Sequence, residues 1–542
     1  MKKTYRNTAV WVPLAIALAF AGGMMLSRYI FSGASPSPAR EKLSTVLGLI
    51  GSEYVDEVDT DSLIEAMFPQ LLSELDPHSS YIAAADLQSV NEELQGSFTG
   101  VGISFTISND SITVLEVISG GPSEKVGLMA GDRIVTVNDS VVAGKSITNE
   151  KVMSVLRGPA GTKVKLGIKR STSPKLLSYE VTRGPIPVTS IDASYMIDPR
   201  TGYIKVNKFA SGTYDEFLTS MVGLKQAGAS RYILDLRGNG GGFMEMAILM
   251  ANEFLPSGSM IVATKGRRPS NDSMTFSDGT GTFTDAQLVV LIDEYSASAS
   301  EILAGAVQDN DRGLTIGRRS FGKGLIQRQI ELPDSSALRL TIARYYTPSG
   351  RCIQKNYTMG GLKDYAGELL SRYESGELFS RDSVKLDKNL IFKTVGGRNV
   401  YGGGGIVPDI FVANDTSSVT SYYLNVLNAG LMQKYAFSYA DLNRQQLSGV
   451  KTVSQLLATL PPDDVLLQSF ADYAASEGIP ARWYYINISR PLLVNQLKAL
   501  IARDILGVSA FYEITNRRDP VVSEALRQLD SGAASIPVTA HQ

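Results

Sequence analysis

The chain has 542 residues, of which 44% are hydrophobic and 20% are charged, and 52 basic side chains face 54 acidic ones for a net charge of −2. Such a length suits roughly three or four domains with real cores, and the composition excludes bulk disorder. The balanced charge argues against a nucleic-acid-binding surface, which would be strongly basic. The single cysteine, Cys352, excludes an internal disulfide, and two histidines, His78 and His541, leave little room for a zinc site. We therefore expect no cofactor.

The N-terminus has the pattern of a targeting segment. Residues 1–8 are basic, and an uncharged apolar run of 18 residues follows over 9–26. As a helix this run would nearly span a bilayer, and positive side chains before it should stay cytoplasmic. We expect a membrane anchor over 9–26 and a flexible tether over 27–40, with a cleaved signal peptide as the alternative.

This reading places the rest of the chain outside the cytoplasm. We expect it to be anchored in the inner membrane and to face the periplasm, or to be secreted to the periplasm if the segment is cleaved. One cysteine and no disulfide fit such a compartment.

Residues 41–95 are predicted to be helical, because apolar side chains recur at helical spacing until Asp76-Pro77 interrupts them. Over 96–184 the pattern changes to short strand-like segments that are separated by glycine and proline residues. Strands are predicted over 101–107, 111–118, 133–138 and 163–170, with a short helix over 149–157.

Strands and helices alternate from residue 185 onward, which is typical of an α/β core. The runs 231–236 and 287–293 are nearly continuous apolar strands, of the kind buried in a parallel sheet. We assign 185–412 to this core and 413–542 to a mostly helical extension.

The unit over 96–184 contains the stretch Gly100-Val101-Gly102-Ile103, which opens a strand, and GGPSEKVGLMAGDRIVTVND over 120–139. With these two stretches it resembles the PDZ domains of bacterial proteases. The resemblance implies that a peptide adds to the sheet as an extra strand, while its terminal carboxylate binds backbone N–H groups at Gly100, Val101, Gly102 and Ile103. The alternative is that these glycines only form turns and bulges.

A second informative stretch runs over 288–327. A buried strand leads to Ser296, Ser298 and Ser300 at the start of a helix, whose N-terminal amides and dipole can stabilise an oxyanion. Lys323 follows Ser298 by 25 positions in a glycine-flanked loop. With no suitable histidine, a lysine is the available base for a serine nucleophile. The residues alone do not separate the three serines.

The chain contains the motifs LDPHSSY, DLRGNGGG, SASASEI, FGKG, YYTPSGRCIQ and YGGGGIVPDI in this order. With these motifs it resembles the carboxy-terminal processing (tail-specific) proteases, which are serine peptidases with a Ser–Lys dyad, and the resemblance covers roughly 41–412. The resemblance implies that Ser298 is the nucleophile, that Lys323 is its base and that Gln327 orients the lysine. It also implies an α/β (α+β) protease core with an inserted PDZ domain and helical N- and C-terminal extensions.

Other site residues follow from this assignment. The oxyanion hole would use the Ala299 amide and a glycine amide, for which we choose Gly241 from the turn 240–242, although a plain tight turn is the alternative. Lys323 must be neutral to accept a proton, so its pKa should fall from about 10.4 to about 7–8. This shift requires the protein to favour the neutral amine over the ammonium by roughly 4 kcal/mol. We expect Glu301, Asp309 and His78 to have structural roles.

The expected function is that of an exported endopeptidase that captures protein C-terminal tails and cleaves peptide bonds through an acyl-enzyme. Its PDZ domain could gate the active site, and Arg157 is a candidate link between this domain and the core. The residues do not decide whether the protein forms a homodimer or has a regulatory partner. The alternative is a membrane-tethered PDZ scaffold without catalysis. A penicillin-binding-protein site at Ser320-Phe-Gly-Lys323 is disfavoured because it needs a helix there, which Gly322 and Gly324 oppose.

Overall fold

The computed structural model describes residues 37–108, 111–118, 120–129, 131–144, 147–170 and 173–533. The predicted segments 1–8 and 9–26 lie outside these residues, as does most of the predicted tether. Within the described part of the chain, no helix combines the length and the apolar character needed to cross a membrane. The chain divides into two compact units, one through Leu72 and the other from Ser73 onward.

The described residues of the first unit form two helices joined by residues 54–59, in agreement with the predicted helical character of this region. Helix α2 spans Pro38–Glu53 and starts after the N-cap Ser37, and helix α3 spans Thr60–Ser73. No side chain of α2 is buried. Packing therefore does little for α2 within its own unit.

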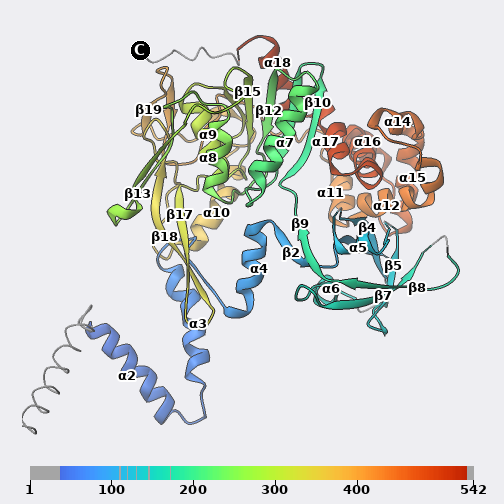
Figure 1. Cartoon of the computed structure of the whole chain (residues 1–542). Coiled ribbons are helices and arrows are strands. Elements are labelled where there is room, and N and C mark those ends of the chain that lie inside the picture. The colour runs from blue at the N-terminus through green and yellow to red at the C-terminus, as the bar shows by residue number, and fades with distance from the viewer. Residues whose placement is uncertain are drawn as a thin grey trace, which may run out of the picture. The chain divides into compact units, whose positions relative to one another are not determined.

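The second unit is built around a six-stranded sheet (Figure 1). Its order is β10-β11-β12-β15-β16-β21, and every neighbouring pair except β10–β11 is parallel. The two predicted apolar strands are β12 and β15, which lie side by side at its centre, as their sequence character required. The strands are β10 (Ile191–Asp198), β11 (Thr201–Val206), β12 (Arg231–Asp235), β15 (Gln287–Ile292), β16 (Leu314–Gly317) and β21 (Ile410–Phe411).

Helices cover both faces of this sheet. On one face, α7 (Thr213–Gln226), α8 (Met244–Asn252) and α9 (Ala299–Asp309) pack against side chains such as Leu234 and Val290. The alternate side chains of the same strands point to the other face, where they meet α18 (Pro520–Asp530). The last helix of the predicted 413–542 extension therefore packs against the central sheet.

A second sheet lies beside the first and was not expected from the sequence. It joins β1 to strands from the middle of the chain in the order β1-β18-β13-β14, with β17 also paired to β18. Its strands and the neighbouring elements are β1 (Ser80–Ile82), β13 (Met260–Gly266), β14 (Ser273–Phe276), β17 (Leu325–Glu331), β18 (Ala337–Tyr346), α4 (Ala84–Gln95), α10 (Leu362–Glu374), β19 (Ile391–Lys393) and β20 (Asn399–Tyr401).

The glycine-rich β unit is inserted into the core through a pair of antiparallel strands, β2 (Ser97–Gly100) and β9 (Gly184–Pro187). The guanidinium of Arg157 lies 5.1 Å from the ring centroid of Phe98 in β2, so Arg157 does contact this connection. The unit contains β3 (Ile103–Ser108), β4 (Ser111–Val117), α5 (Pro122–Lys125), β5 (Arg133–Val137), β6 (Ser140–Val141), α6 (Asn149–Leu156), β7 (Lys163–Lys169) and β8 (Leu177–Thr182).

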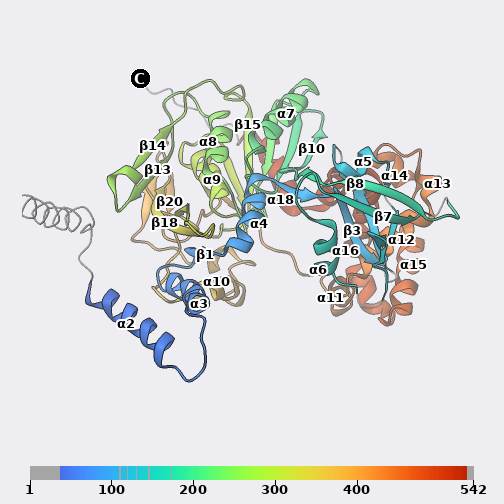
Figure 2. The same ribbon diagram turned by 60° about the horizontal axis from the view of Figure 1, so that its bottom comes forward.

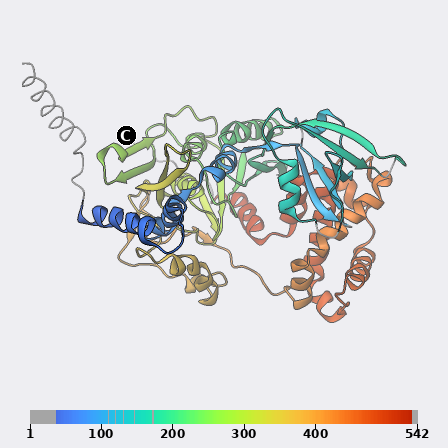
Figure 3. The same ribbon diagram turned by 90° about the horizontal axis from the view of Figure 1, so that it is seen from below.

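A helical domain follows the core and has a hydrophobic core of its own. It lies beside the inserted β unit, as Figures 2 and 3 show from two sides, and Leu115 lines a cavity together with Phe437 and Ile505 of this domain. Its helices are α11 (Ser421–Asn428), α12 (Leu431–Leu442), α13 (Arg444–Leu447), α14 (Val453–Thr459), α15 (Asp463–Ser476), α16 (Trp483–Leu506) and α17 (Val508–Thr515).

Candidate active site

Ser298 lies at the sharp turn between β15 and the buried helix α9, where it is the N-cap residue. Its backbone has φ 57° and ψ −114°, a conformation that a non-glycine residue adopts only when its surroundings enforce it. A strained strand-to-helix turn that presents a serine is the geometry of a nucleophile elbow. The turn also places Ser298 at the positive end of the α9 dipole.

The environment of the three serines differs. Ser296 Oγ donates to the carbonyl of Leu236, and Ser300 Oγ donates to the carbonyl of Asn239, with both serines fully buried. Ser298 alone of the three is partly exposed. Accessibility therefore favours Ser298, the choice that the family resemblance implied.

One carboxylate connects the backbones of the two predicted dyad residues. Glu301 Oε2 accepts hydrogen bonds from the N–H groups of Ser298 at 2.9 Å and Lys323 at 2.8 Å. Its other oxygen accepts from Gly322 N–H at 2.7 Å and from Ser320 Oγ at 2.5 Å. A fully buried side chain with four donors aimed at it holds the turn and the lysine loop in one frame.

Tyr345 makes a matching contact with the backbone carbonyl groups of the same two residues. Its hydroxyl lies 2.7 Å from the carbonyl oxygen of Lys323 and 3.1 Å from that of Ser298. The side chain is almost completely buried, and burial raises its pKa well above the usual range, so the hydroxyl stays protonated. Sequence reasoning missed both bridges, although a glutamate three positions after an N-cap serine is a recognisable capping pattern.

The surroundings of Lys323 favour the neutral amine. Burial lowers its pKa, the positive charge of Arg339 lowers it further, and Glu301 and Asp76 oppose these effects. Among the described residues, no carboxylate forms an ion pair with Lys323. Asp309 pairs instead with the buried Arg351 at 2.7 Å, in agreement with its expected structural role.

Gln327 forms no hydrogen bond with the Lys323 amine within the described part of the chain. Its side-chain amide donates to Thr341 Oγ1 at 3.4 Å, and Thr341 in turn donates to Asp76 at 3.1 Å. The structure likewise shows no hydrogen bond between Ser298 Oγ and Lys323 Nζ, both of which lie in its described part. The catalytic roles of these side chains remain predictions, since catalytic hydrogen bonds often tighten only when substrate is bound.

The predicted oxyanion hole is supported at one of its two donors. Ala299 N–H, at the first turn of α9, forms no hydrogen bond with any described residue. Gly241 N–H, in contrast, already donates to Asn239 Oδ1 at 2.8 Å. Within the described chain, the neighbouring amides of Gly240 and Gly242 have no such bond, so they fit the second donor better than Gly241, which we chose.

Gly241 has a different importance. Its φ is +101°, and a Cβ there would lie 2.8 Å from both Ala297 O and Ser298 Cβ. Only glycine lets the loop approach Ser298 so closely.

His78 is not placed as a base. Its Nε2 lies 2.8 Å from the hydroxyl of Tyr365, and burial, assisted by the positive charge of Lys323, lowers its pKa to about 4. It is therefore neutral near pH 7, which agrees with the expected structural role.

In the inserted β unit, β3 is the outermost strand of its sheet, with β4 on its inner side. The N–H groups of Val101 and Gly102 directly before β3 form no hydrogen bond with any residue that the structure describes. Gly102 has φ +82° and a Cβ would approach Ile186 and Pro122, so glycine is required here. A free strand edge next to open amides is the arrangement that peptide addition needs.

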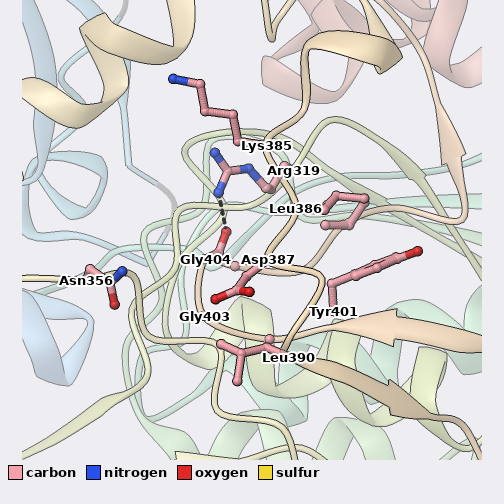
Figure 4. A pocket seen from close by; sticks show the side chains of 12 residues that line it. Arg319, Asn356, Lys385, Leu386, Asp387, Leu390, Tyr401, Gly403 and Gly404 are labelled. Carbon is pink, nitrogen blue, oxygen red and sulfur yellow. Dashed lines mark hydrogen bonds between the residues drawn. The ribbon is translucent and has the colours of Figure 1, made fainter.

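A separate cavity of about 330 Å³ lies beside the motif YGGGGIVPDI. Figure 4 shows its lining, in which Arg319 donates to the carbonyl of Gly404 at 2.7 Å. Neither dyad residue lines it. The motif instead supports the lysine loop, because Ile406 N–H donates to Ser320 Oγ at 2.6 Å. No group of side chains suited to a metal ion occurs among the described residues.

Comparison with known proteins agrees with this geometry. The model of peptidase family S41 matches residues 200–364, a PDZ domain model matches 99–181, and a family of unknown function matches 422–507. A carboxy-terminal-processing protease of Bartonella bacilliformis is 39% identical over 310 residues, which are 56% of this chain and 70% of that protein. The carboxy-terminal processing protease CtpA of Bacillus subtilis is 34% identical over 331 residues, or 60% and 70%.

Among solved structures, a PDZ domain of a carboxy-terminal protease from Vibrio cholerae, in complex with peptide, is 27% identical, with a TM-score of 0.16. It covers 17% of this chain and 97% of that one. The sequence relatives and the two domain matches agree on one assignment. The chain belongs to the carboxy-terminal processing protease family of S41 serine peptidases, with an inserted PDZ domain.

Proposed function

We propose that this protein is an exported endopeptidase that cleaves peptide bonds through an acyl-enzyme on Ser298. The observation that carries the proposal is the Glu301 carboxylate, which binds the backbone N–H groups of Ser298 and Lys323 at once. A nucleophile and a base held on one buried anchor keep their separation without relying on flexible side chains.

In the first step, Ser298 Oγ attacks the peptide carbonyl carbon, and its proton passes to the neutral Lys323 amine. The oxyanion that forms accepts a hydrogen bond from Ala299 N–H and from one glycine N–H of the 240–242 turn. Lys323 then returns the proton to the departing amine as the C–N bond breaks. Water, deprotonated by the same lysine, hydrolyses the ester and frees Ser298.

The PDZ domain would select the substrate by its C-terminal tail. The tail would pair with the outer edge of β3, and its carboxylate would bind the amides of Val101 and Gly102. Backbone pairing requires only that the tail be extended, whereas the apolar side chains of Val117, Leu128 and Met129, which line a cavity together with Ser104 of β3, favour apolar tails.

The test is cleavage of an unfolded protein such as casein by the full chain, with wild type compared with Ser298→Ala and with Lys323→Ala. Mass spectrometry of the products should show peptides for wild type only. If Ser298→Ala cleaves as fast as wild type, the acyl-enzyme is wrong. If no form cleaves but all bind an apolar C-terminal peptide, the scaffold alternative is favoured.

Export and membrane attachment are also proposals, and they rest on the basic residues 1–8 and the apolar run 9–26. Cell fractionation of the full chain should place it in the inner membrane. Recovery from the soluble periplasmic fraction, with a shortened N-terminus, would instead indicate a cleaved signal peptide.

A further inference from the structure

The loop 238–242, which carries the predicted oxyanion amides and is called the oxyanion loop below, begins directly after Arg237. The side chain of Arg237 binds two carboxylates, one from the nearby Asp235 and one from the distant Asp519. Asp235 lies 2.6 Å from Nη2 and 3.0 Å from Nε of the guanidinium. Asp519, immediately before α18, accepts a hydrogen bond from Nη1 at 2.8 Å. The C-terminal segment thus reaches the root of the loop that carries the oxyanion amides.

The charges around Arg237 are balanced only when Asp519 is present. Lys205, which is 6% exposed, donates through Nζ to the backbone carbonyl of Arg237 and lies 3.5 Å from Asp235. Two cations therefore face two carboxylates. Without Asp519, the two cations would share the single buried Asp235, and the Nη1 group would lose its acceptor.

Displacement of Arg237 would be transmitted to the catalytic turn. Gly238 N–H donates to Asp293 Oδ1 at 2.9 Å, which fixes the next residue of the loop. The carbonyl of Asn239 then accepts from Ala297 N–H at 3.0 Å and from Ser300 Oγ at 2.9 Å. These bonds connect the loop to the residues on either side of Ser298.

Asp519 itself is held firmly. Its Oδ1 caps α18 by accepting from the N–H groups of Val521 at 2.8 Å and Val522 at 3.1 Å, which leaves Oδ2 for Arg237. The helix it caps is seated by Val522 and Ala525 in the core against the central sheet. This segment lies outside the residues that the peptidase, PDZ and unknown-function family models match.

We propose that Asp519 is a positioning residue for the oxyanion hole, acting through Arg237; this inference rests on the function proposed for the Ser298–Lys323 site. Asp519 touches neither dyad residue, and its effect on the reaction is to hold the loop amides where the oxyanion forms. An aspartate in the C-terminal segment thereby makes activity depend on the correct docking of α18.

Asp519→Asn separates this role from helix capping, because the asparagine Oδ1 still caps α18 while its amide group presents a donor to Arg237. Asp519→Ser is a second variant, which retains a cap but is too short to reach Arg237. The matched control is Asp530→Asn at the other end of the same helix, where Asp530 pairs with Arg231 at 2.7 Å and not with Arg237.

The experiment measures kcat and KM of the full chain, the affinity for a peptide boronate that binds serine proteases as a transition-state mimic, and backbone hydrogen exchange over residues 236–243. For Asp519→Asn we expect kcat and boronate affinity to fall about 10-fold, less than for the loss of an oxyanion donor, with KM unchanged. Exchange over 236–243 should become faster. Asp530→Asn should match wild type in all three measurements.

The inference is overturned if both Asp519 variants fold and keep wild-type kcat and loop exchange, or if Asp530→Asn shows the same losses as Asp519→Asn. A wild type that neither cleaves peptides nor binds the boronate would contradict the proposed function instead. In that case the exchange of 236–243 still decides whether Asp519 positions the loop.

Discussion

The side chains of Lys355, which is buried, and Lys323, which is partly buried, have different surroundings. Lys355 Nζ is 3.1 Å from the Glu368 carboxylate and 3.9 Å from the ring centroid of Phe321, with the Tyr365 ring at 4.2 Å. Lys323, in the loop after Phe321, has no such carboxylate among the described residues. Burial lowers the pKa of both amines, but Glu368 opposes this only at Lys355.

The comparison indicates that the groups next to a lysine amine, and not its burial alone, decide whether the amine suits the role of a base or that of a structural cation. An ammonium that has a carboxylate and two aromatic faces is stabilised in its charged form. An amine that lacks an ion-pair partner and lies near Arg339 is easier to deprotonate. Lys355 is therefore the internal reference against which the role of Lys323 can be tested.

The largest expected effect comes from removing each amine in turn. Lys323→Met should lower kcat by at least about 10³-fold while the protein stays folded, because the serine loses its base. Lys355→Met should keep kcat within about 3-fold but lower the free energy of unfolding by about 1–3 kcal/mol, because its buried ion pair is lost. Casein cleavage and urea denaturation measure the two quantities. The comparison fails if Lys355→Met is the inactive variant.

The second largest effect should come from Glu301, whose carboxylate binds the backbone N–H groups of both Ser298 and Lys323. Glu301→Gln places an amide N–H₂ group, itself a donor, among the four donors that surround Glu301. We therefore expect kcat to fall about 10²-fold and the free energy of unfolding to fall by about 2–4 kcal/mol. Glu294→Gln is the control, because Glu294 is also mostly buried but pairs with Arg318 at 2.7 Å and, among the described residues, accepts no hydrogen bond from Ser298 or Lys323. Equal losses in the two variants would show that any buried glutamate here is merely structural.

The pH dependence of kcat/KM should report Lys323. In the proposed mechanism the neutral amine is the base, so activity should be present above the pKa of Lys323 and should be lost, tenfold per unit, as pH falls through it. The midpoint should lie below about 10.4, the ordinary lysine value. His78 has a pKa of about 4 and should add no step near neutral pH. A step near pH 6.5 that disappears in His78→Gln would contradict this assignment.

The smallest effect should come from Arg339, whose positive charge helps to lower the pKa of Lys323. Arg339→Gln should raise the midpoint of the pH profile by less than about one unit, since partly solvated charges interact weakly. Glu368→Gln, which changes only the surroundings of Lys355, should leave that midpoint in place. A downward shift in Arg339→Gln would show that the charge acts in another way.

Much of the fold was predictable because its elements have strong local signals. The apolar runs that became β12 and β15 and the glycine punctuation of the PDZ unit all predicted the observed elements. The second sheet was not predicted, because β1 pairs with β18 across more than 250 positions and its strands are partly exposed. Its pairing depends on contacts that no short window of sequence contains.

By itself, the sequence determined the family, the inserted PDZ domain, and the serine and lysine that the family resemblance assigns to the dyad, because these depend on residue types at set spacings. Only the tertiary structure distinguished Ser298 from its buried neighbours, directed the amide of Gly241 to Asn239 and assigned α18 to the core. It also brought Glu301, Tyr345 and Asp519 to the site. These outcomes depend on where side chains and N–H groups point after distant segments pack, which spacing along the chain does not encode.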